Sequence, residues 1–176
     1  MKNTTISAVM AAAILLTGCG KQSPGGSGTP TPASGGAASS ATPVSQPALT
    51  AWQQGDKAAA VTNFLAADWS AHPLFAADSP LSLSEKQFVA LSDADRQVKS
   101  ATMMPQLDSI KQLAAAVIQT GTDAAAKGDT AQARKCFTAL KQCGTALSGP
   151  DSLAMVQLVG KALTKKADAE LAKIGP

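Results

Sequence analysis

The chain has 176 residues and a formal net charge of +3, from 15 Lys and Arg against 12 Asp and Glu. Because the charges are nearly balanced and form no run of five like charges, the composition argues against a nucleic-acid partner. Tyr is absent and aromatic residues make up 3% of the chain, which disfavours a β-sandwich; the abundant alanine, leucine, lysine and glutamine favour helices.

The N-terminus combines one basic residue, an apolar run and a cysteine. Lys2 precedes the uncharged, almost wholly apolar segment from Ile6 to Leu16, and Cys19 follows closely. As a helix this segment would rise only about 16 Å, roughly half the thickness of a bilayer core. Its length therefore favours a cleaved signal sequence over a membrane span.

The four residues Leu16-Thr17-Gly18-Cys19 resemble the lipobox of bacterial lipoproteins. This resemblance implies that residues 1–18 are a signal peptide, cut between Gly18 and Cys19, and that the Cys19 thiol and new amine are acylated. The acylated Cys19 would then bind the protein to a lipid bilayer. Gly20 follows the acceptor in place of the aspartate typical of inner-membrane retention, so the outer membrane is expected if the cell has two membranes.

A segment of biased composition separates this cysteine from the rest of the chain. Of the 28 residues from Gly20 to Pro47, 24 are Gly, Pro, Ser, Thr or Ala. Such a segment cannot bury enough apolar surface to offset the entropy that ordering would cost. We therefore expect a disordered linker over residues 19–47, followed by a helical domain over residues 48–176.

The domain is expected to begin with a helical hairpin. Pro47 can open a helix over residues 48–54, because its fixed φ suits the first helical position. Gly55 can end that helix in the left-handed conformation, and Asp56 can accept hydrogen bonds from the first N–H groups of a second helix. That second helix is expected over residues 57–70.

A second Gly-Asp pair, Gly128-Asp129, starts the same pattern again. The shared positions are Gly55, Asp56, Ala58, Ala60, Phe64 and Ala66 in the first copy and Gly128, Asp129, Ala131, Ala133, Phe137 and Ala139 in the second. The small residue and the phenylalanine four positions later lie on one helix face. This pattern resembles the second helix of a tetratricopeptide repeat, and Gly121 stands where that family places a close-packed glycine on its first helix. The resemblance implies antiparallel helical hairpins.

Further boundaries follow from proline, glycine and capping residues. Residues 71–81 are expected to form a loop, and Ser82-Leu83-Ser84-Glu85 fits a capping box before a short helix with Phe88, Val89 and Leu91 inward. Helices are then expected from Ser92 to about Lys127, with a kink or restart at Pro105, over residues 131–146, and after Asp151 or Ser152. The residues expected on their buried faces are Leu107, Ile110, Leu113, Ala114, Val117, Ile118, Gly121, Ala125, Ala133, Phe137, Leu140, Leu147, Leu153, Val156, Gly160, Leu163, Ala167, Leu171 and Ile174. The expected fold is all-α, with five to seven helices in antiparallel hairpins.

Cys136 and Cys143 stand seven positions apart on one expected helix. A continuous helix would separate them by about 10.5 Å along its axis, beyond the reach of a disulfide. Buried thiols are the favoured interpretation, with a disulfide after local helix disruption or a redox or metal role as alternatives. No histidine or further cysteine stands at ligand spacing, so we expect no metal and no other cofactor.

The polar residues show no recognisable catalytic arrangement. His72 is the sole histidine and is interpreted as a surface residue of a loop. Asp93 and Asp95 are interpreted as helix-start residues, with paired catalytic carboxylates as the alternative. Trp52 and Trp69 are expected to pack in the core, with ligand contact as the alternative. We therefore expect no enzymatic activity.

The sequence thus favours a membrane-anchored helical module that binds another protein of the cell envelope. The face that carries the repeat would place Asn63, Gln132 or Lys135 beside a groove. The alternative is a structural lipoprotein whose C-terminal helix contacts lipid head groups or peptidoglycan through its lysines. These lysines are Lys161, Lys165, Lys166 and Lys173.

Overall fold

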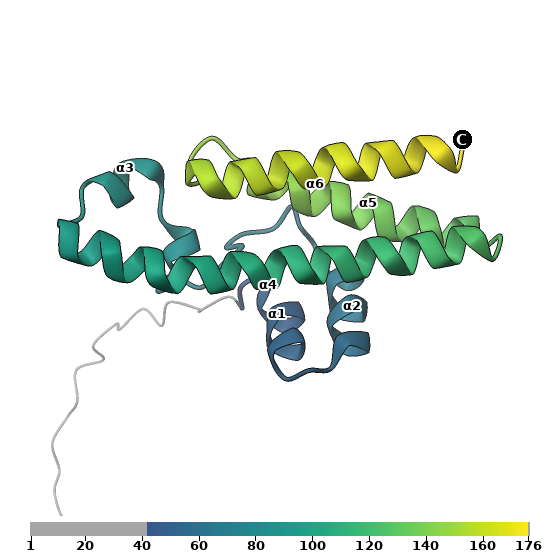
Figure 1. Cartoon of the computed structure of the whole chain (residues 1–176), viewed down its shortest axis with the longest axis horizontal. Helices are drawn as coiled ribbons and strands as arrows, with labels where there is room; N and C mark the ends of the chain where they lie inside the picture. The colour runs from purple at the N-terminus through teal and green to yellow at the C-terminus, as the bar shows by residue number, and fades with distance from the viewer. Residues whose placement is uncertain (1–41, 176) are drawn as a thin grey trace, which may run out of the picture. The chain divides into compact units, whose positions relative to one another are not determined.

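The computed structural model describes residues 42–175, and every regular element among them is helical (Figure 1). This confirms the expected all-α fold class for the described part of the chain. The proposed signal peptide, Cys19 and the linker up to residue 41 lie outside the described residues. Among the helices that are described, none combines the length and the apolar character that crossing a bilayer requires.

The first two helices, α1 (Gln46–Gln53) and α2 (Lys57–Ala66), form the expected hairpin. The domain begins earlier than predicted, because α1 starts within the expected linker and Ser45 is already buried. Helix α2 is shorter than predicted. It ends where Ala67 turns to extended backbone, and the Trp69 indole N–H then donates a hydrogen bond to the carbonyl of Phe64.

Helix α4 (Asp93–Ala126) is the longest element, with 34 residues. Ser92 caps it by accepting a hydrogen bond from the N–H of Asp95, as the sequence predicts. Of the kink or restart predicted at Pro105, the restart does not occur, because the helix continues through this residue (Figure 1). Pro105 and Ala101 are both exposed, so water can hydrate the Ala101 carbonyl that receives no helical N–H.

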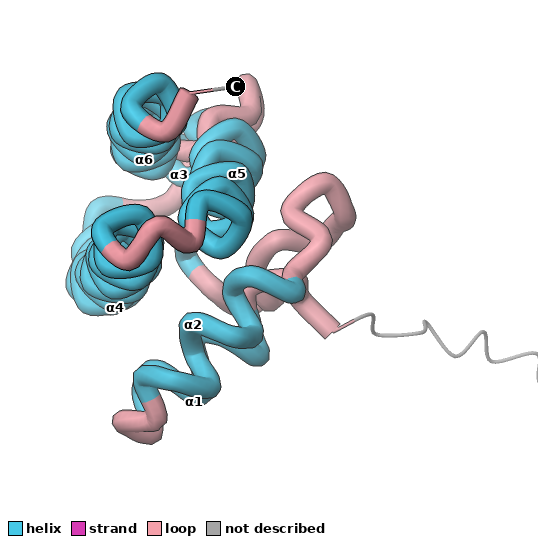
Figure 2. Tube along the Cα trace, turned by 90° about the vertical axis from the view of Figure 1, so that its right-hand side faces the viewer, coloured by secondary structure: helices cyan, strands magenta, loops and turns pink. Residues whose placement is uncertain are grey.

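Helices α5 (Thr130–Leu147) and α6 (Ala154–Lys173) complete the fold. Figure 2 shows α4, α5 and α6 side by side and nearly end-on, with α5 against both neighbours and the α1–α2 hairpin beside α4. Most residues predicted on the inner faces are buried. Those buried are Leu107, Ile110, Leu113, Ala114, Val117, Gly121, Ala133, Phe137, Leu140, Leu147, Leu153, Val156, Gly160, Leu163 and Ala167, while Ile118, Ala125, Leu171 and Ile174 are half-buried.

Two short elements, the 3₁₀ helix η1 (Pro80–Ser82) and α3 (Glu85–Val89), precede α4. The capping box is centred two residues later than predicted, on Ser84 and Gln87. Glu85 instead accepts a hydrogen bond at 3.0 Å from the N–H of Ala154, the first residue of α6. This distant carboxylate replaces the predicted cap from Asp151 or Ser152. Val89 is 60% exposed, so its predicted inward position is wrong.

The two Gly-Asp turns have the same hydrogen bonds. Gly55 and Gly128 have φ angles of 82° and 80°, and the following aspartates accept from the N–H groups of Ala59 and Gln132. The aspartate N–H groups in turn donate to carbonyls five residues earlier, as in a Schellman motif. The repeated turn is therefore confirmed at the level of single hydrogen bonds.

The repeat also places the same residue types in the core. Ala60 and Ala133 are fully buried, and Phe64 and Phe137 are each 1% exposed. At Gly121, a Cβ atom would lie 2.8 Å from the ring of Phe137, so only glycine fits there. The packing of a tetratricopeptide repeat over the whole hairpin stays a prediction.

A second glycine contact joins α5 to α6. A Cβ atom at Gly160 would lie 2.5 Å from the carbonyl oxygen of Gly144, and one at Gly144 would lie 2.7 Å from that of Gly160. The two backbones therefore touch where the helices cross. Sequence reasoning placed Gly160 on the buried face but did not identify Gly144 as its partner.

Candidate functional site

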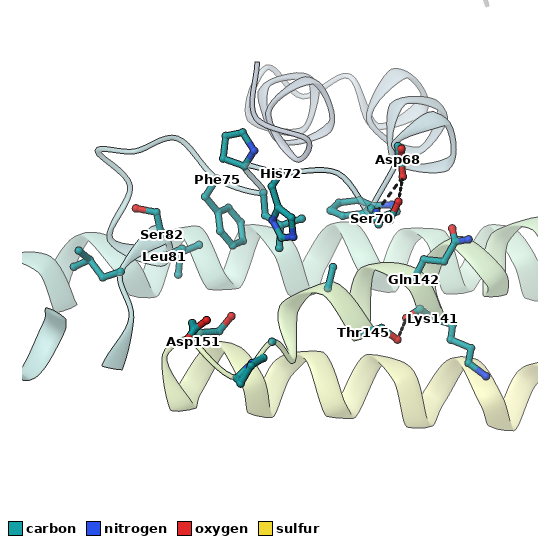
Figure 3. Close-up of a pocket in the computed structure, with 18 of the residues that line it drawn as sticks. Asp68, Ser70, His72, Phe75, Leu81, Ser82, Lys141, Gln142, Thr145 and Asp151 are labelled. Atoms are coloured by element: carbon teal, nitrogen blue, oxygen red, sulfur yellow. Dashed lines mark hydrogen bonds between the residues drawn. The ribbon is translucent and has the colours of Figure 1, made fainter. Parts of the chain in front are cut away.

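A groove of about 810 Å³ lies between the segment 68–83 and helix α5 (Figure 3). We call it the loop groove. It is lined by Asp68, Trp69, Ser70, His72, Pro73, Leu74, Phe75, Leu81, Ser82, Leu83, Thr138, Lys141, Gln142, Thr145, Ala146, Gly149, Pro150, Asp151 and Ser152. Its volume is within the range usual for ligand sites.

The first wall begins where α2 ends. Trp69 is 5% exposed, and its ring lies 4.7 Å from that of Phe64, centroid to centroid. Together with its hydrogen bond to the Phe64 carbonyl, this contact fixes the indole at the base of the wall. The core therefore determines the position of this aromatic surface.

The middle of the same wall is held by the chain that enters the domain. The N–H groups of Val44 and Ser45 donate to the carbonyls of Pro73 and Leu74, and the Ser45 hydroxyl donates to the Leu74 carbonyl at 2.6 Å. These bonds hold the segment around Phe75, which is 8% exposed, against the bundle. The wall therefore has a defined backbone despite its lack of regular structure.

The far end of the wall is tied to α4. The Ser79 hydroxyl donates to the side-chain carbonyl of Gln106 at 2.8 Å and accepts from the N–H of Leu81 at the start of η1. Leu81 is 3% exposed. The first wall is thus anchored at both ends and in the middle.

The second wall is polar and belongs to α5. Thr138, Lys141, Gln142 and Thr145 line the groove at intervals of three or four residues, which places them along one face of the helix. All four are exposed. The Lys141 ammonium forms an ion pair at 2.7 Å with Asp168 of α6, which balances its charge.

A carboxylate stands near each end of the groove. Asp68 follows α2 and Asp151 lies in the turn between α5 and α6, as Figure 3 shows. The Ser70 hydroxyl and N–H both donate to Asp68, at 2.6 and 3.0 Å, and these bonds lower the pKa of that carboxyl. Asp68 is thus held ionised. None of the ion pairs formed among the described residues involves Asp68 or Asp151.

The groove does not include the residues that we expected beside it. Asn63 donates a hydrogen bond to the Pro47 carbonyl, and Gln132 contacts the sulfur of Cys136 on its own helix at 3.7 Å. Lys135 is exposed on α5 outside the groove lining. The expected groove over the repeat face is therefore not this cavity, which forms where the loop crosses α5.

His72 is an exposed loop residue, as predicted, but it also lines the groove. Trp69 is in the core as expected, while Trp52 is half-buried with the Lys57 ammonium 5.8 Å from its ring centroid. The groove contact of His72 could not be read from its sequence neighbours. It arises because segment 68–83 crosses α5.

The predicted helix-start residues are confirmed at the start of α4. Asp93 pairs with Arg96, and Asp95 accepts a hydrogen bond from Ser92 at 2.6 Å. Neither carboxylate lines the groove. Both therefore serve the first turn of the helix.

The two cysteines of α5 are buried free thiols, as predicted. Burial raises the pKa of both thiols. The helix between them is uninterrupted, which excludes the disulfide that local disruption would have allowed. Residues 42–175 contain no group of three or more His, Cys, Asp or Glu side chains placed to hold a metal ion.

The lysines of α6 divide into two pairs. Lys166 and Lys173 both donate to the buried carboxylate of Glu170, at 2.6 and 2.9 Å. Lys161 and Lys165 instead border a shallow surface depression of about 480 Å³, together with Thr145, Ser148, Thr164 and Asp168. Lys161 and Lys165 are therefore the pair that forms no hydrogen bond with Glu170.

Sequence reasoning missed the groove residues of α5 because each is an ordinary exposed position of an amphipathic helix. Their spacing was visible, but nothing in the sequence indicates that the segment 68–83 crosses them.

Comparisons of the chain with protein-family models, with curated proteins and with solved structures find no match.

Proposed function

We propose that the protein is a membrane-anchored, non-enzymatic helical lipoprotein that acts as a protein-interaction module in the cell envelope. The observation that carries the proposal is the loop groove, an open cavity of about 810 Å³ that combines apolar residues of the segment 68–83 with polar side chains of α5. Apolar surface supplies binding free energy, and a few placed polar groups orient the ligand. A rigid wall also lowers the entropy cost of binding.

The anchor follows from the resemblance of Leu16-Thr17-Gly18-Cys19 to a lipobox. Each buried CH₂ of an acyl chain contributes about 0.8 kcal/mol, so two or more chains on Cys19 would hold the protein durably on a bilayer. The segment from residue 20 to residue 41 would then act as the spacer between anchor and groove.

The test places a photo-crosslinking amino acid in the groove of the full-length protein in cells. Thr138 is the site, because it lines the groove and not the depression beside Lys161, and Thr122 on the exposed face of α4 is the matched control outside the groove. We expect one defined protein adduct from position 138 and none from position 122. The substitution Gln142→Trp should fill the groove with a larger side chain and thereby abolish the adduct. Equal adducts at both positions, or none at either, would refute the proposed docking site.

A second candidate function is supported by Lys161 and Lys165, which face solvent without a Glu170 contact. They could contact lipid head groups or peptidoglycan. Charge reversal at Lys161 and Lys165 would release the protein from isolated envelopes only if this contact adds to the acyl anchor. The same reversal at Lys111, on α4, is the control.

A further inference from the structure

The chemistry of the loop groove indicates which ligand it fits. Its first wall offers the apolar side chains of Pro73, Leu74 and Leu83, which are exposed or half-buried, whereas the buried Trp69 and Phe75 hold the wall in place. Side chains that are already partly packed lose little further entropy when a ligand covers them. The centre of a bound ligand should therefore be apolar.

The opposite wall favours a peptide over an acyl chain. The polar side chains between Thr138 and Thr145 lie along about 10.5 Å of α5, and those of Lys141 and Gln142 stand between them. An extended peptide carries amide groups along its whole length and can exchange hydrogen bonds with such a row. A hydrocarbon chain would leave these groups without partners in a partly desolvated groove.

The charges near the ends of the groove are negative. Lys141 is paired with Asp168, whereas Asp68 and Asp151 have no cationic side chain within ion-pair distance among residues 42–175. Figure 3 places these two carboxylates near opposite ends of the cavity. Electrostatic complementarity therefore favours positive charge at both ends of the ligand.

We propose that the loop groove binds an extended peptide segment of a partner protein, with an apolar centre and a basic residue toward each end. This inference rests on the proposed interaction function and specifies the chemistry of its partner. The apolar centre contacts Pro73 and Leu74, the peptide backbone lies along α5, and the basic side chains approach Asp68 and Asp151.

The test uses three synthetic peptides of equal length with the same apolar centre. They carry lysines, glutamines or glutamates at both ends, and their binding to the full-length protein is measured by fluorescence polarisation. We expect the lysine peptide to bind most tightly and the glutamate peptide least tightly. Raising the salt concentration should reduce this preference, because the two carboxylates are at the surface.

The variants Asp68→Asn and Asp151→Asn locate the effect. Each should weaken the lysine peptide about threefold, and both together about tenfold, as expected for exposed ion pairs. The glutamine peptide should bind all variants equally. Asp108→Asn on α4 is the matched control, because it removes a carboxylate that does not line the groove. Circular dichroism of each variant verifies that the helices are intact.

Several results would overturn the inference. They are equal binding of the three peptides, no saturable binding, or a double variant that behaves like Asp108→Asn. Tighter binding of dodecylamine than of the lysine peptide would identify a lipid ligand and equally refute it. A groove-specific adduct at Thr138 without any charge preference would refute this inference alone, whereas the absence of that adduct in the protein that keeps Gln142 would refute the proposed function.

Discussion

Gly55 and Gly128 fix the two turns on which the hairpins depend. Both have φ near 80°, where a Cβ atom is strained, although no neighbouring atom lies within 4 Å of the place it would occupy. The requirement for glycine at these positions is thus conformational rather than a matter of space. It belongs to the single residue and needs no partner elsewhere in the chain.

Gly128→Ala should therefore destabilise the protein by about 1–2 kcal/mol, the cost of the left-handed conformation for an L-residue. Gly128→Asn should cost less, because asparagine tolerates this conformation. Urea unfolding followed by circular dichroism measures both. Gly149→Ala is the control, since its φ is not positive and its nearest neighbours are 3.6 Å away. Equal stability of the Ala variant and the wild type would contradict the argument.

Contacts between elements depend on glycine for a different reason. Gly160→Ala should destabilise the protein by about 1–3 kcal/mol, because the added methyl group would meet the backbone of α5, which cannot move without separating the helices. Thermal unfolding of this variant beside Ala162→Ser, on the exposed face of α6, measures the effect. A midpoint equal to that of Ala162→Ser would show that the crossing adapts.

Helix α6 also carries a pH-dependent contribution. Hydrogen bonds first from Lys166 and then from Lys173 lower the pKa of Glu170 below the ordinary value of 4.5. A carboxyl whose pKa is lower in the folded state stabilises the protein above the ordinary pKa, and this stability is lost as the pH falls through the folded-state pKa. The stabilisation by the Glu170 carboxylate should therefore be fully present above about pH 4.5 and be lost as the solution is made more acidic than this.

Glu170→Gln should lower stability at pH 7 by about 0.5–1 kcal/mol, a modest value because solvent screens the exposed lysines. The difference from the wild type should vanish near pH 2. Thermal midpoints from pH 7 to pH 2 measure it, with Asp108→Asn as a control for an exposed ion pair. A difference that stays constant over this range would indicate a packing effect instead.

At the scale of the whole molecule, anchoring and folding should be separable. Cys19 lies outside the described residues, and the helices of residues 42–175 make their core contacts among themselves. Cys19→Ser should therefore release the protein from the membrane fraction without changing the helical circular dichroism spectrum. Fractionation and mass spectrometry of the N-terminus measure the first effect. Membrane retention of the variant with an unacylated N-terminus would contradict the lipobox interpretation.

The sequence determined most helix boundaries and both Gly-Asp turns, because a cap or a left-handed glycine depends on atoms only a few residues away. It also predicted the buried thiols, since helical spacing alone separates Cys136 from Cys143. The inward placement of Val89 was wrong because the local pattern does not determine which side chains remain exposed.

Only the tertiary structure decided where the loop groove lies. Glu85 caps α6 from 69 positions away, Gly144 meets Gly160 across two helices, and the loop groove combines a segment before α3 with side chains of α5. Each of these depends on how distant segments pack against one another, and that packing is set by the sum of many apolar contacts rather than by any local pattern. For this reason the groove and its two carboxylates could not be found from the sequence.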